Sequence, residues 1–190
     1  MLAQLRPAVV AYALLTVVTG VAYPLIVTGI GQLVFSEQAN GSLHVVEGKT
    51  VGSSLIGQPF SDPRYFFGRP SATAPFPYNA AASSGSNLGP TNPALIAAVN
   101  ERVTALRKLD PTNVAPIPID LVTGSGSGLD PHISPAAALY QVSRVARLRQ
   151  VSAEKVRHLV NRHTEGRTLG ILGEPRVNVL LLNLDLDALR

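Results

Sequence analysis

Residues 8–34 read AVVAYALLTVVTGVAYPLIVTGIGQLV, a run of 27 residues without a charged side chain. At 1.5 Å per residue such a helix is about 40 Å long, whereas the hydrocarbon core of a bilayer is about 30 Å thick. The alternative is a cleaved signal peptide, but its apolar part is usually about 7–15 residues long. No Ala-x-Ala cleavage pattern follows Val34 either. We therefore expect one transmembrane helix over residues 8–34, with Pro24 as the site of a kink.

One side of this helix carries small residues. Ala13, Thr16, Gly20 and Gly31 fall near one stripe at helical spacing, and Pro24 lies beside it. Small residues let a second helix approach closely in lipid, although Gly and Thr are also common in membrane helices generally. We interpret these five residues as candidate contacts with a partner. The run holds no Asp, Glu, Lys or Arg, so the helix alone predicts no ion path.

The rest of the chain suffices for one folded domain. Residues 1–7 form a short flank before the helix, and residues 36–190 form the extramembrane part. Only Arg6 of the 16 basic residues precedes the run, so the domain has 15 basic against 12 acidic residues. It has no basic run with interleaved aromatics, so nothing favours nucleic acid as a partner. The chain also lacks cysteine, which excludes disulfides and thiolate chemistry. The Lys and Arg bias around the helix is too small to fix its orientation.

Local patterns predict an α+β domain with about three helices and a small sheet. A hairpin is expected at residues 44–46 and 50–55, with residues 47–49 as its turn. Residues 57–93 are rich in Gly, Pro, Ser and aromatics, which indicates an ordered loop used for packing or binding. Three helices are expected to begin after polar N-caps: Thr91 or Asn92, then Ser134, then Ser152.

Spacing of apolar residues assigns faces to these helices. The first has an apolar stripe of Leu95, Ile96, Val99, Val103 and Leu106, and the third has Val156, Leu159 and Val160. In the second, Leu139, Val142, Val145 and Ala146 are expected inside, and Arg144, Arg147 and Arg149 mostly outside. Residues 117–123 predict a strand. Residues 177–186 predict a half-buried strand, or a strand that runs into a short helix.

Patterns for chemistry are weak. Residues 125–130, Ser-Gly-Ser-Gly-Leu-Asp, resemble a phosphate-binding loop in composition, but they lack the required Lys, and Asp130 would repel phosphate. Asp130, His132, His163 and Glu165 match no known spacing of metal ligands. No Gly-x-Ser-x-Gly elbow follows a clear strand. We therefore expect no catalytic residue, no metal site and no cofactor of the chain's own.

Several segments, spread over nearly the whole chain, carry a resemblance to a known family. They are Thr19–Leu25, Gln38–Leu43, Gly68–Ala72, Pro77–Asn79, Ser86–Pro93, Ser125–Ile133 and Gly173–Val179. Together they resemble KdpC, the C subunit of the bacterial high-affinity potassium-transporting P-type ATPase. Within these segments, the candidate contacts with partner subunits are Tyr78, Asn87, Ser125, Gly126, Gly128, Asp130 and His132.

The resemblance implies a single-pass protein of the bacterial inner membrane with its domain in the periplasm. It implies two partners, a channel-like potassium-binding subunit and a P-type ATPase subunit that hydrolyses ATP. The chain would then be a non-catalytic accessory subunit that aids assembly, stability and potassium transport. The alternative is a catalytic chaperone that raises the ATP affinity of the ATPase subunit. ATP binding by this chain is an implication of the family alone.

Overall fold

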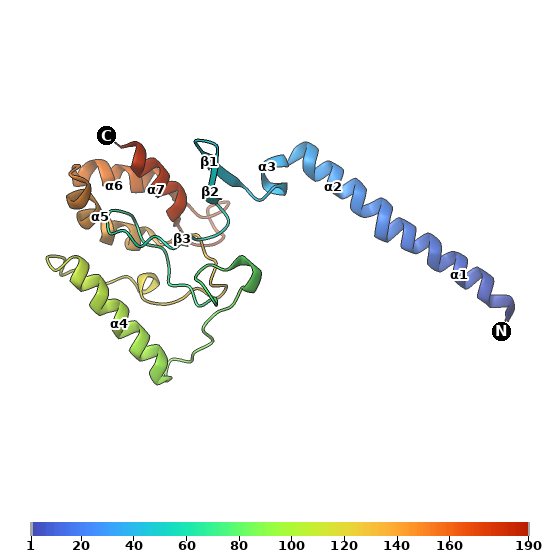
Figure 1. The fold of residues 1–190 in the computed structure, drawn as a ribbon, viewed down its shortest axis with the longest axis horizontal. Helices are drawn as coiled ribbons and strands as arrows, with labels where there is room; N and C mark the ends of the chain where they lie inside the picture. The colour runs from blue at the N-terminus through green and yellow to red at the C-terminus, as the bar shows by residue number, and fades with distance from the viewer. Residues whose placement is uncertain (1, 190) are drawn as a thin grey trace. The chain divides into compact units, whose positions relative to one another are not determined.

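The computed structural model describes residues 2–189 (Figure 1). They divide into two compact units, one that ends at Leu43 and one that begins at His44. The first is helical and the second combines helices with small antiparallel sheets, so the predicted α+β class is confirmed.

The first unit is dominated by one apolar helix. It comprises α1 (Leu2–Val17), a π-helical turn η1 (Val18–Ala22) and α2 (Tyr23–Val34), and a short helix α3 (Ser36–Ala39) follows. The segment Ala3–Val34 is long and apolar enough to cross a membrane, and its side chains are exposed. It is the one such segment among residues 2–189.

The π turn ends at Ala22, two residues before Pro24. Proline lacks an N–H, and its ring clashes with the carbonyl four residues earlier, so a widened turn lets the helix continue through it. The additional residue of such a turn rotates everything after it by roughly 100° about the axis. Pro24 and Gly31 are therefore displaced around the helix from Ala13 and Thr16, relative to the stripe expected from uniform spacing.

A hairpin of β1 (Leu43–Val46) and β2 (Lys49–Ser53) stands at the start of the second unit, and only its first residue, Leu43, is counted in the first. Glu47 and Gly48 have φ angles of 50° and 77°. Two-residue hairpin turns of this kind match the twist of the flanking strands. The predicted hairpin is confirmed, with a turn one residue shorter than expected because Lys49 belongs to the strand.

Four longer helices follow, each with a side-chain N-cap. Ser134 and Ser152 cap α5 and α6 as predicted, and Asn92 is the cap of α4. The helices are α4 (Pro93–Leu109), α5 (Pro135–Arg149), α6 (Ala153–Arg162) and α7 (Val179–Ala188). Figure 1 shows α5, α6 and α7 gathered together, with α4 at the margin of the domain. Accordingly Leu106 of α4 is buried, whereas Ile96 is 52% exposed, contrary to its expected inward position.

A three-stranded antiparallel sheet has the order β3 (His132–Ile133), β5 (Arg176–Asn178), β4 (Thr164–Glu165). Val177 lies opposite both Ile133 and Thr164 and is fully buried. Strand β5 runs directly into α7, which confirms the second of the two alternatives for residues 177–186. The turn from strand to helix is possible because Asn178 caps α7 by accepting from Leu181 N–H.

The strand predicted at residues 117–123 is wrong. A 3-10 helix, η3 (Ile119–Leu121), occupies its centre, with a second 3-10 helix, η2 (Ala80–Ala82), earlier in the chain. Pro118 has no N–H for a strand ladder, so the segment turns and buries Leu121 and Val122 instead.

The core lies between α5, α6, α7 and the three-stranded sheet. Its fully buried members are Phe66, Ala137, Ala138, Val145, Val156, Val160, Val177, Leu182 and Leu186. Phe66 comes from the long loop, so the expectation that this loop is ordered is confirmed. The outward position expected for Arg144 is wrong, because this residue is only 3% exposed.

Candidate functional site

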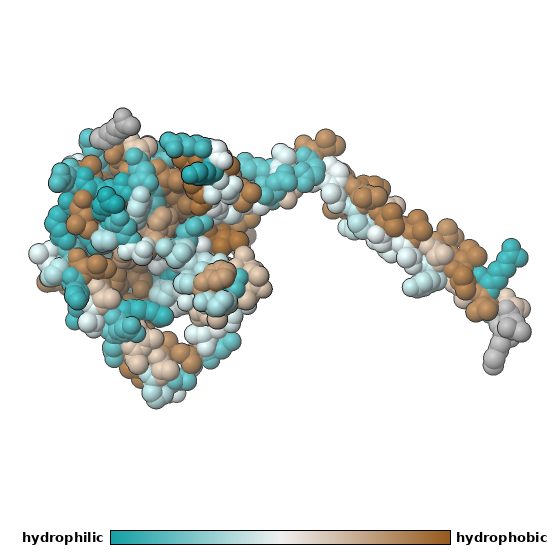
Figure 2. Space-filling view, viewed as in Figure 1, coloured by the Kyte–Doolittle hydropathy of each residue, from teal (hydrophilic) through white to brown (hydrophobic). Residues whose placement is uncertain are grey.

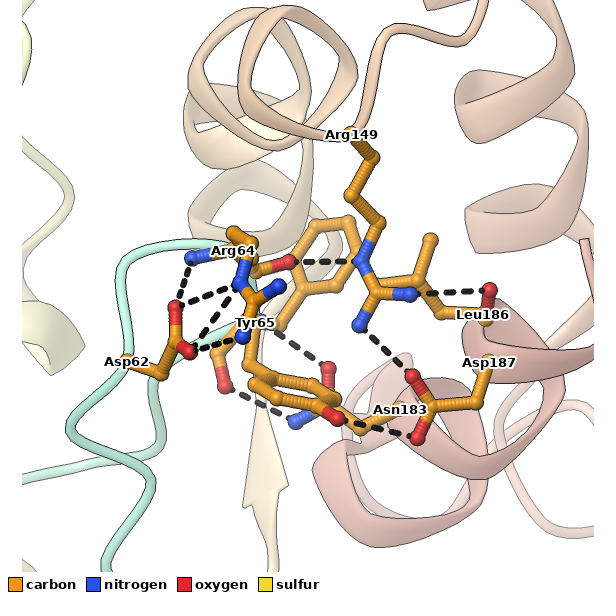
Figure 3. A network of polar contacts seen from close by, with 8 residues as sticks. Asp62, Arg64, Tyr65, Arg149, Asn183, Leu186 and Asp187 are labelled. Atoms are coloured by element: carbon orange, nitrogen blue, oxygen red, sulfur yellow. Dashed lines mark hydrogen bonds and ion pairs between the residues drawn. The ribbon is translucent and has the colours of Figure 1, made fainter.

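Residues 60–67 of the long loop, here called the aromatic strap, are fastened to α5 and α7 by amide side chains. Asn183 accepts from Phe66 N–H at 2.9 Å and donates to Phe66 C=O at 3.0 Å (Figure 3). Gln141 likewise accepts from Phe67 N–H at 2.8 Å and donates to Phe67 C=O at 3.1 Å. Each amide thus replaces the two-point pairing that a neighbouring strand would supply, and it satisfies backbone groups at the edge of the core.

Two arginines complete the attachment of the strap. Arg144 donates to the carbonyls of Pro63 and Tyr65 and lies 4.4 Å from the Phe67 ring centroid. Burial lowers the pKa of Arg144 to about 10. Arg149 lies 4.6 Å from the Tyr65 ring centroid and pairs with Asp187 at 2.7 Å, as Figure 3 shows. The strap has an irregular backbone, so its carbonyl groups have no neighbouring strand to pair with. The arginines of α5 that face the strap donate hydrogen bonds to these carbonyls.

Directly after the strap, residues 68–89 interlock with the glycine loop, residues 124–130. Ser71 is the centre of the contact, because its hydroxyl donates to Gly128 C=O at 2.7 Å and accepts from Tyr78 N–H at 2.9 Å. Ser84 N–H donates to Ser127 C=O at 3.0 Å. Arg69 reaches Gly124 C=O at 3.1 Å. The two loops therefore hold each other in one shape.

Close packing explains Gly128 of the interlock and Gly57, which precedes it in the chain. Gly128 has φ of +69°, and a Cβ there would lie 2.6 Å from Ser84 O. A Cβ on Gly57 would lie 2.3 Å from the ring of Tyr78. In contrast, a Cβ on Gly126 meets nothing within 4 Å, so that glycine faces open space.

Tyr78 closes one side of the interlock. Its hydroxyl donates to Arg69 C=O at 2.5 Å. Burial, followed by the negative charge of Asp130, raises the pKa of Tyr78 to about 12. Its protonated hydroxyl is thus a fixed part of the structure at neutral pH.

A pocket of about 460 Å³ opens beside the interlock. Its charged and polar lining comprises Arg69, Asp120, Asp130, His132, Ser134, Glu174 and Arg176. Asp130 lies 3.3 Å from Arg69 and accepts from His132 N–H at 2.9 Å. Burial acts to raise the pKa of Asp130, but the hydrogen bonds from His132 and the charge of Arg69 outweigh it and lower that pKa.

The remaining charges of the pocket are also engaged. Asp120 accepts from both the N–H and the hydroxyl of Ser134 at 2.7 and 3.2 Å, ahead of α5. Glu174 pairs with Arg167, and Arg176 pairs with Glu165. The charged side chains named here are therefore already engaged in contacts within the domain.

The hydrogen bonds of the glycine loop and the positions of the candidate ligands also bear on whether phosphate or a metal ion could bind. Three N–H groups of the glycine loop are used inside the domain, since Ser125 donates to Pro70, Gly128 to the Ser125 hydroxyl and Leu129 to the Ser127 hydroxyl. Of the four residues considered as metal ligands, Asp130 and His132 contact each other, whereas His163 pairs with Asp185 and Glu165 with Arg176. Within residues 2–189, no group of three or more ligand side chains could hold a metal ion.

Comparison with known proteins gives the family. Residues 5–188 match the family model of the K+-transporting ATPase, c chain. A potassium-transporting ATPase KdpC subunit of Methylococcus capsulatus is 66% identical over 190 residues, and one of Sorangium cellulosum is 65% identical over 190 residues, each covering 100% of both chains. One of Dechloromonas aromatica is 65% identical over 184 residues, 97% of this chain and 96% of its own. The chain belongs to the KdpC family. The predicted resemblance is confirmed, and the chain is a subunit of a potassium-transporting ATPase.

The KdpC fold brings most of the candidate contacts of the domain together. Tyr78, Ser125, Gly126 and Gly128 belong to the interlock, and Asp130 and His132 line the adjoining pocket. Ser125 and Gly128 are buried, so they shape this surface from within, whereas Gly126 is exposed. Asn87 is exposed farther along the loop, with φ of +51°.

The five candidates of the apolar helix lie in the other unit. A Cβ on Gly20 or Gly31 meets nothing within 4 Å. Figure 2 shows a paler side and a strongly hydrophobic side along this helix. The π turn displaces Pro24 and Gly31 from the expected stripe, and contact of the five residues with a partner stays a prediction.

Sequence reasoning missed Arg69 and Ser71 as members of the site. Both lie in the segment Gly68–Ala72, which carried the family resemblance but offered no chemical motif. Their roles depend on Gly124, Asp130 and Gly128, which lie 55 to 61 residues away in the sequence. No local pattern could reveal these contacts.

Proposed function

We propose that this KdpC-family chain is a non-catalytic accessory subunit that stabilises the assembled potassium-transporting ATPase and so supports potassium transport. Its apolar helix would anchor it once in the bacterial inner membrane, with the domain in the periplasm. Its partners would be the channel-like potassium-binding subunit and the ATP-hydrolysing P-type subunit. The observation that carries this proposal is the interlock: candidate contacts are held in one shape by bonds inside the domain.

The same observation weighs against the alternative, a catalytic chaperone that raises ATP affinity. A nucleotide phosphate needs free N–H donors and positive charge. In the glycine loop, the N–H groups of Ser125, Gly128 and Leu129 already donate to acceptors within the domain. The next residue, Asp130, is a carboxylate, which adds negative charge where phosphate needs positive charge. A preformed surface for protein docking accounts for this arrangement without a ligand.

A bulky residue at Gly126 tests the docking surface. Because Gly126 faces open space, Gly126→Trp should leave the domain folded yet obstruct a partner. We expect at least fivefold less P-type and channel-like subunit to co-purify with the variant from detergent-solubilised membranes of potassium-starved cells. Ala105→Trp, at an exposed position of α4, is the matched control and should retain both. Equal retention by the two variants would contradict the proposed surface.

The absence of cysteine allows a clean test of the periplasmic location. Val114 is 95% exposed, so Val114→Cys should react with a membrane-impermeant maleimide in intact spheroplasts. Gln4→Cys, on the other end of the apolar helix, should react only after permeabilisation. The reverse pattern of labelling would place the domain in the cytoplasm and reopen the nucleotide alternative.

A further inference from the structure

From the end of β4 to the start of β5 the chain forms an exposed arm, residues 165–176. Glu174 and Arg176 at its base line the pocket described above, but its tip is not among the residues of that site. Thr168 and Leu172 pair as an isolated antiparallel bridge, with N–H to C=O distances of 2.9 and 3.0 Å in the two directions. Leu169 and Gly170, with φ of 55° and 76°, make the turn at its tip. The arm is thus an ordered hairpin rather than a slack loop.

Charges across the arm cancel in pairs. Arg167 donates to both carboxylate oxygens of Glu174 at 2.7 and 2.8 Å, and Arg176 donates to Glu165 at 3.0 Å. The arm therefore has no net charge along its stem. The contacts that hold the arm in shape lie within the arm, so the side chains at its tip are available to contact a partner.

The tip presents aliphatic side chains to solvent. Leu169 is 85%, Ile171 74% and Leu172 57% exposed. Three such side chains make an apolar patch on the order of a few hundred Å², as large as the largest patch on a typical monomer, and patches of that size are often functional. An exposed apolar patch of this size marks the tip as a candidate interaction site.

The composition of the arm favours a protein pocket over a lipid surface. Segments that bind membrane surfaces combine free Lys or Arg with Trp, Tyr or Phe. Residues 165–176 contain no aromatic residue and no Lys, and both arginines are paired with glutamates.

The size of the patch favours a partner that another contact already holds. A stable interface buries roughly 800 Å² on each side, which is more than this tip offers, so a second copy of the chain could not be held by it alone. A partner that is also bound by the apolar helix Ala3–Val34 would meet the tip at high effective concentration. A small apolar contact then suffices.

Resting on the proposed function, we infer that the tip formed by Leu169, Ile171 and Leu172 inserts into an apolar pocket on an integral-membrane partner subunit of the same ATPase. The tip acts as a further point of attachment, beside the apolar helix and the interlock, and it helps to fix the orientation of the domain on the complex. The apolar helix keeps the domain close to the partner, and the tip fixes how the domain is positioned on that partner.

Photo-crosslinking in potassium-starved cells tests this inference. A p-benzoyl-phenylalanine placed at Ile171 should crosslink to one subunit of the ATPase, with at least fivefold higher yield than the same probe at Val114. Val114 is the matched control because it is an equally aliphatic side chain that is 95% exposed elsewhere in the domain. Crosslinks from position 171 to lipid alone, to a second copy alone, or at the yield of position 114 would overturn the inference.

Co-purification separates this inference from the function on which it rests. If the subunits co-purify with the chain but position 171 gives no subunit crosslink, the tip has no docking role and the accessory function stands. If no subunit co-purifies, both fail. As a second variant, Leu169→Ser/Ile171→Ser should weaken retention of the partner at least fivefold relative to Val114→Ser; equal retention would also overturn the docking role.

Discussion

The aromatic strap and the hairpin arm are both irregular segments at the edge of one domain, but they complete their backbone bonds differently. In the strap, Phe66 and Phe67 take their partners from Asn183 and Gln141 on two helices. In the arm, Thr168 and Leu172 pair with each other.

The fate of the apolar side chains follows this difference. Phe66 is 0% exposed, whereas Leu169 is 85% exposed. A segment that borrows its partners from the core becomes part of the core. A segment that completes itself can project its apolar residues outward, where a partner can cover them.

The largest effect that separates the two regions is expected at Asn183. Asn183→Leu removes two bonds and leaves the buried N–H and C=O of Phe66 unsatisfied, at about 1–3 kcal/mol for each group. The free energy of unfolding should therefore fall by about 3–5 kcal/mol. Urea unfolding of the full-length chain in detergent micelles, followed by circular dichroism, measures it. The exposed Asn161→Leu is the control, and an equal loss there would refute a special role for the amide clamp.

The next effect compares one arginine from each region. Arg144→Met removes donors to Pro63 and Tyr65 and the contact with the Phe67 ring, so we expect a loss of about 2–3 kcal/mol. Arg176→Met removes an ion pair of the arm whose side chains are 52% and 51% exposed, so its cost should stay below about 0.5 kcal/mol. The same unfolding experiment measures both variants. Similar losses of unfolding free energy in the two variants would show that the arm and the strap contribute equally to the stability of the domain.

The contrast also explains what the sequence could and could not predict. The N-caps Ser134 and Ser152 were predicted, and Asn92 was one of two alternatives, because a cap bonds to an N–H two or three residues away. The strap depends on Asn183, which lies 117 residues from Phe66. Arg144 was expected outside because charged side chains are seldom buried unless paired, and its partners are strap carbonyls that no sequence pattern reveals.

The candidate site divides in the same way. Gly126, Gly128 and Asp130 were found because they stand in a conspicuous glycine-rich segment. Arg69 and Ser71 were missed because they matter only once two distant loops meet. For Leu169 and Ile171 a signal did exist, since both lie among glycines in an otherwise polar stretch between two strands, but an exposed aliphatic residue is recognised only when its burial is known.

A smaller effect concerns acid, at the start of the strap. Hydrogen bonds from the side chain and then the N–H of Arg64 lower the pKa of Asp62 from 3.8 to about 2. A carboxylate with a lowered folded pKa contributes stability above pH 3.8, and this contribution is lost as the pH falls through about 2. Carbon-detected NMR titration of the full-length chain should show Asp62 titrating near pH 2, and Arg64→Gln should return it toward 3.8. An unchanged Asp62 titration in that variant would contradict the assigned cause.

The smallest effect is expected at the stem of the arm. It tests whether the arm, unlike the strap, contributes little to the stability of the domain. Arg167 and Glu174 form a well-aligned pair, yet their side chains are 45% and 78% exposed, so water and salt compete for both charges. Arg167→Gln, Glu174→Gln and the double variant should each change the unfolding free energy by less than about 0.5 kcal/mol, and a double-mutant cycle should give a coupling of about 0.2–0.5 kcal/mol that shrinks in high salt. A loss of several kcal/mol would mean that the arm is coupled to the core as the strap is. Its aliphatic tip would then be an outlying part of the fold, and the reason for assigning it a partner would disappear.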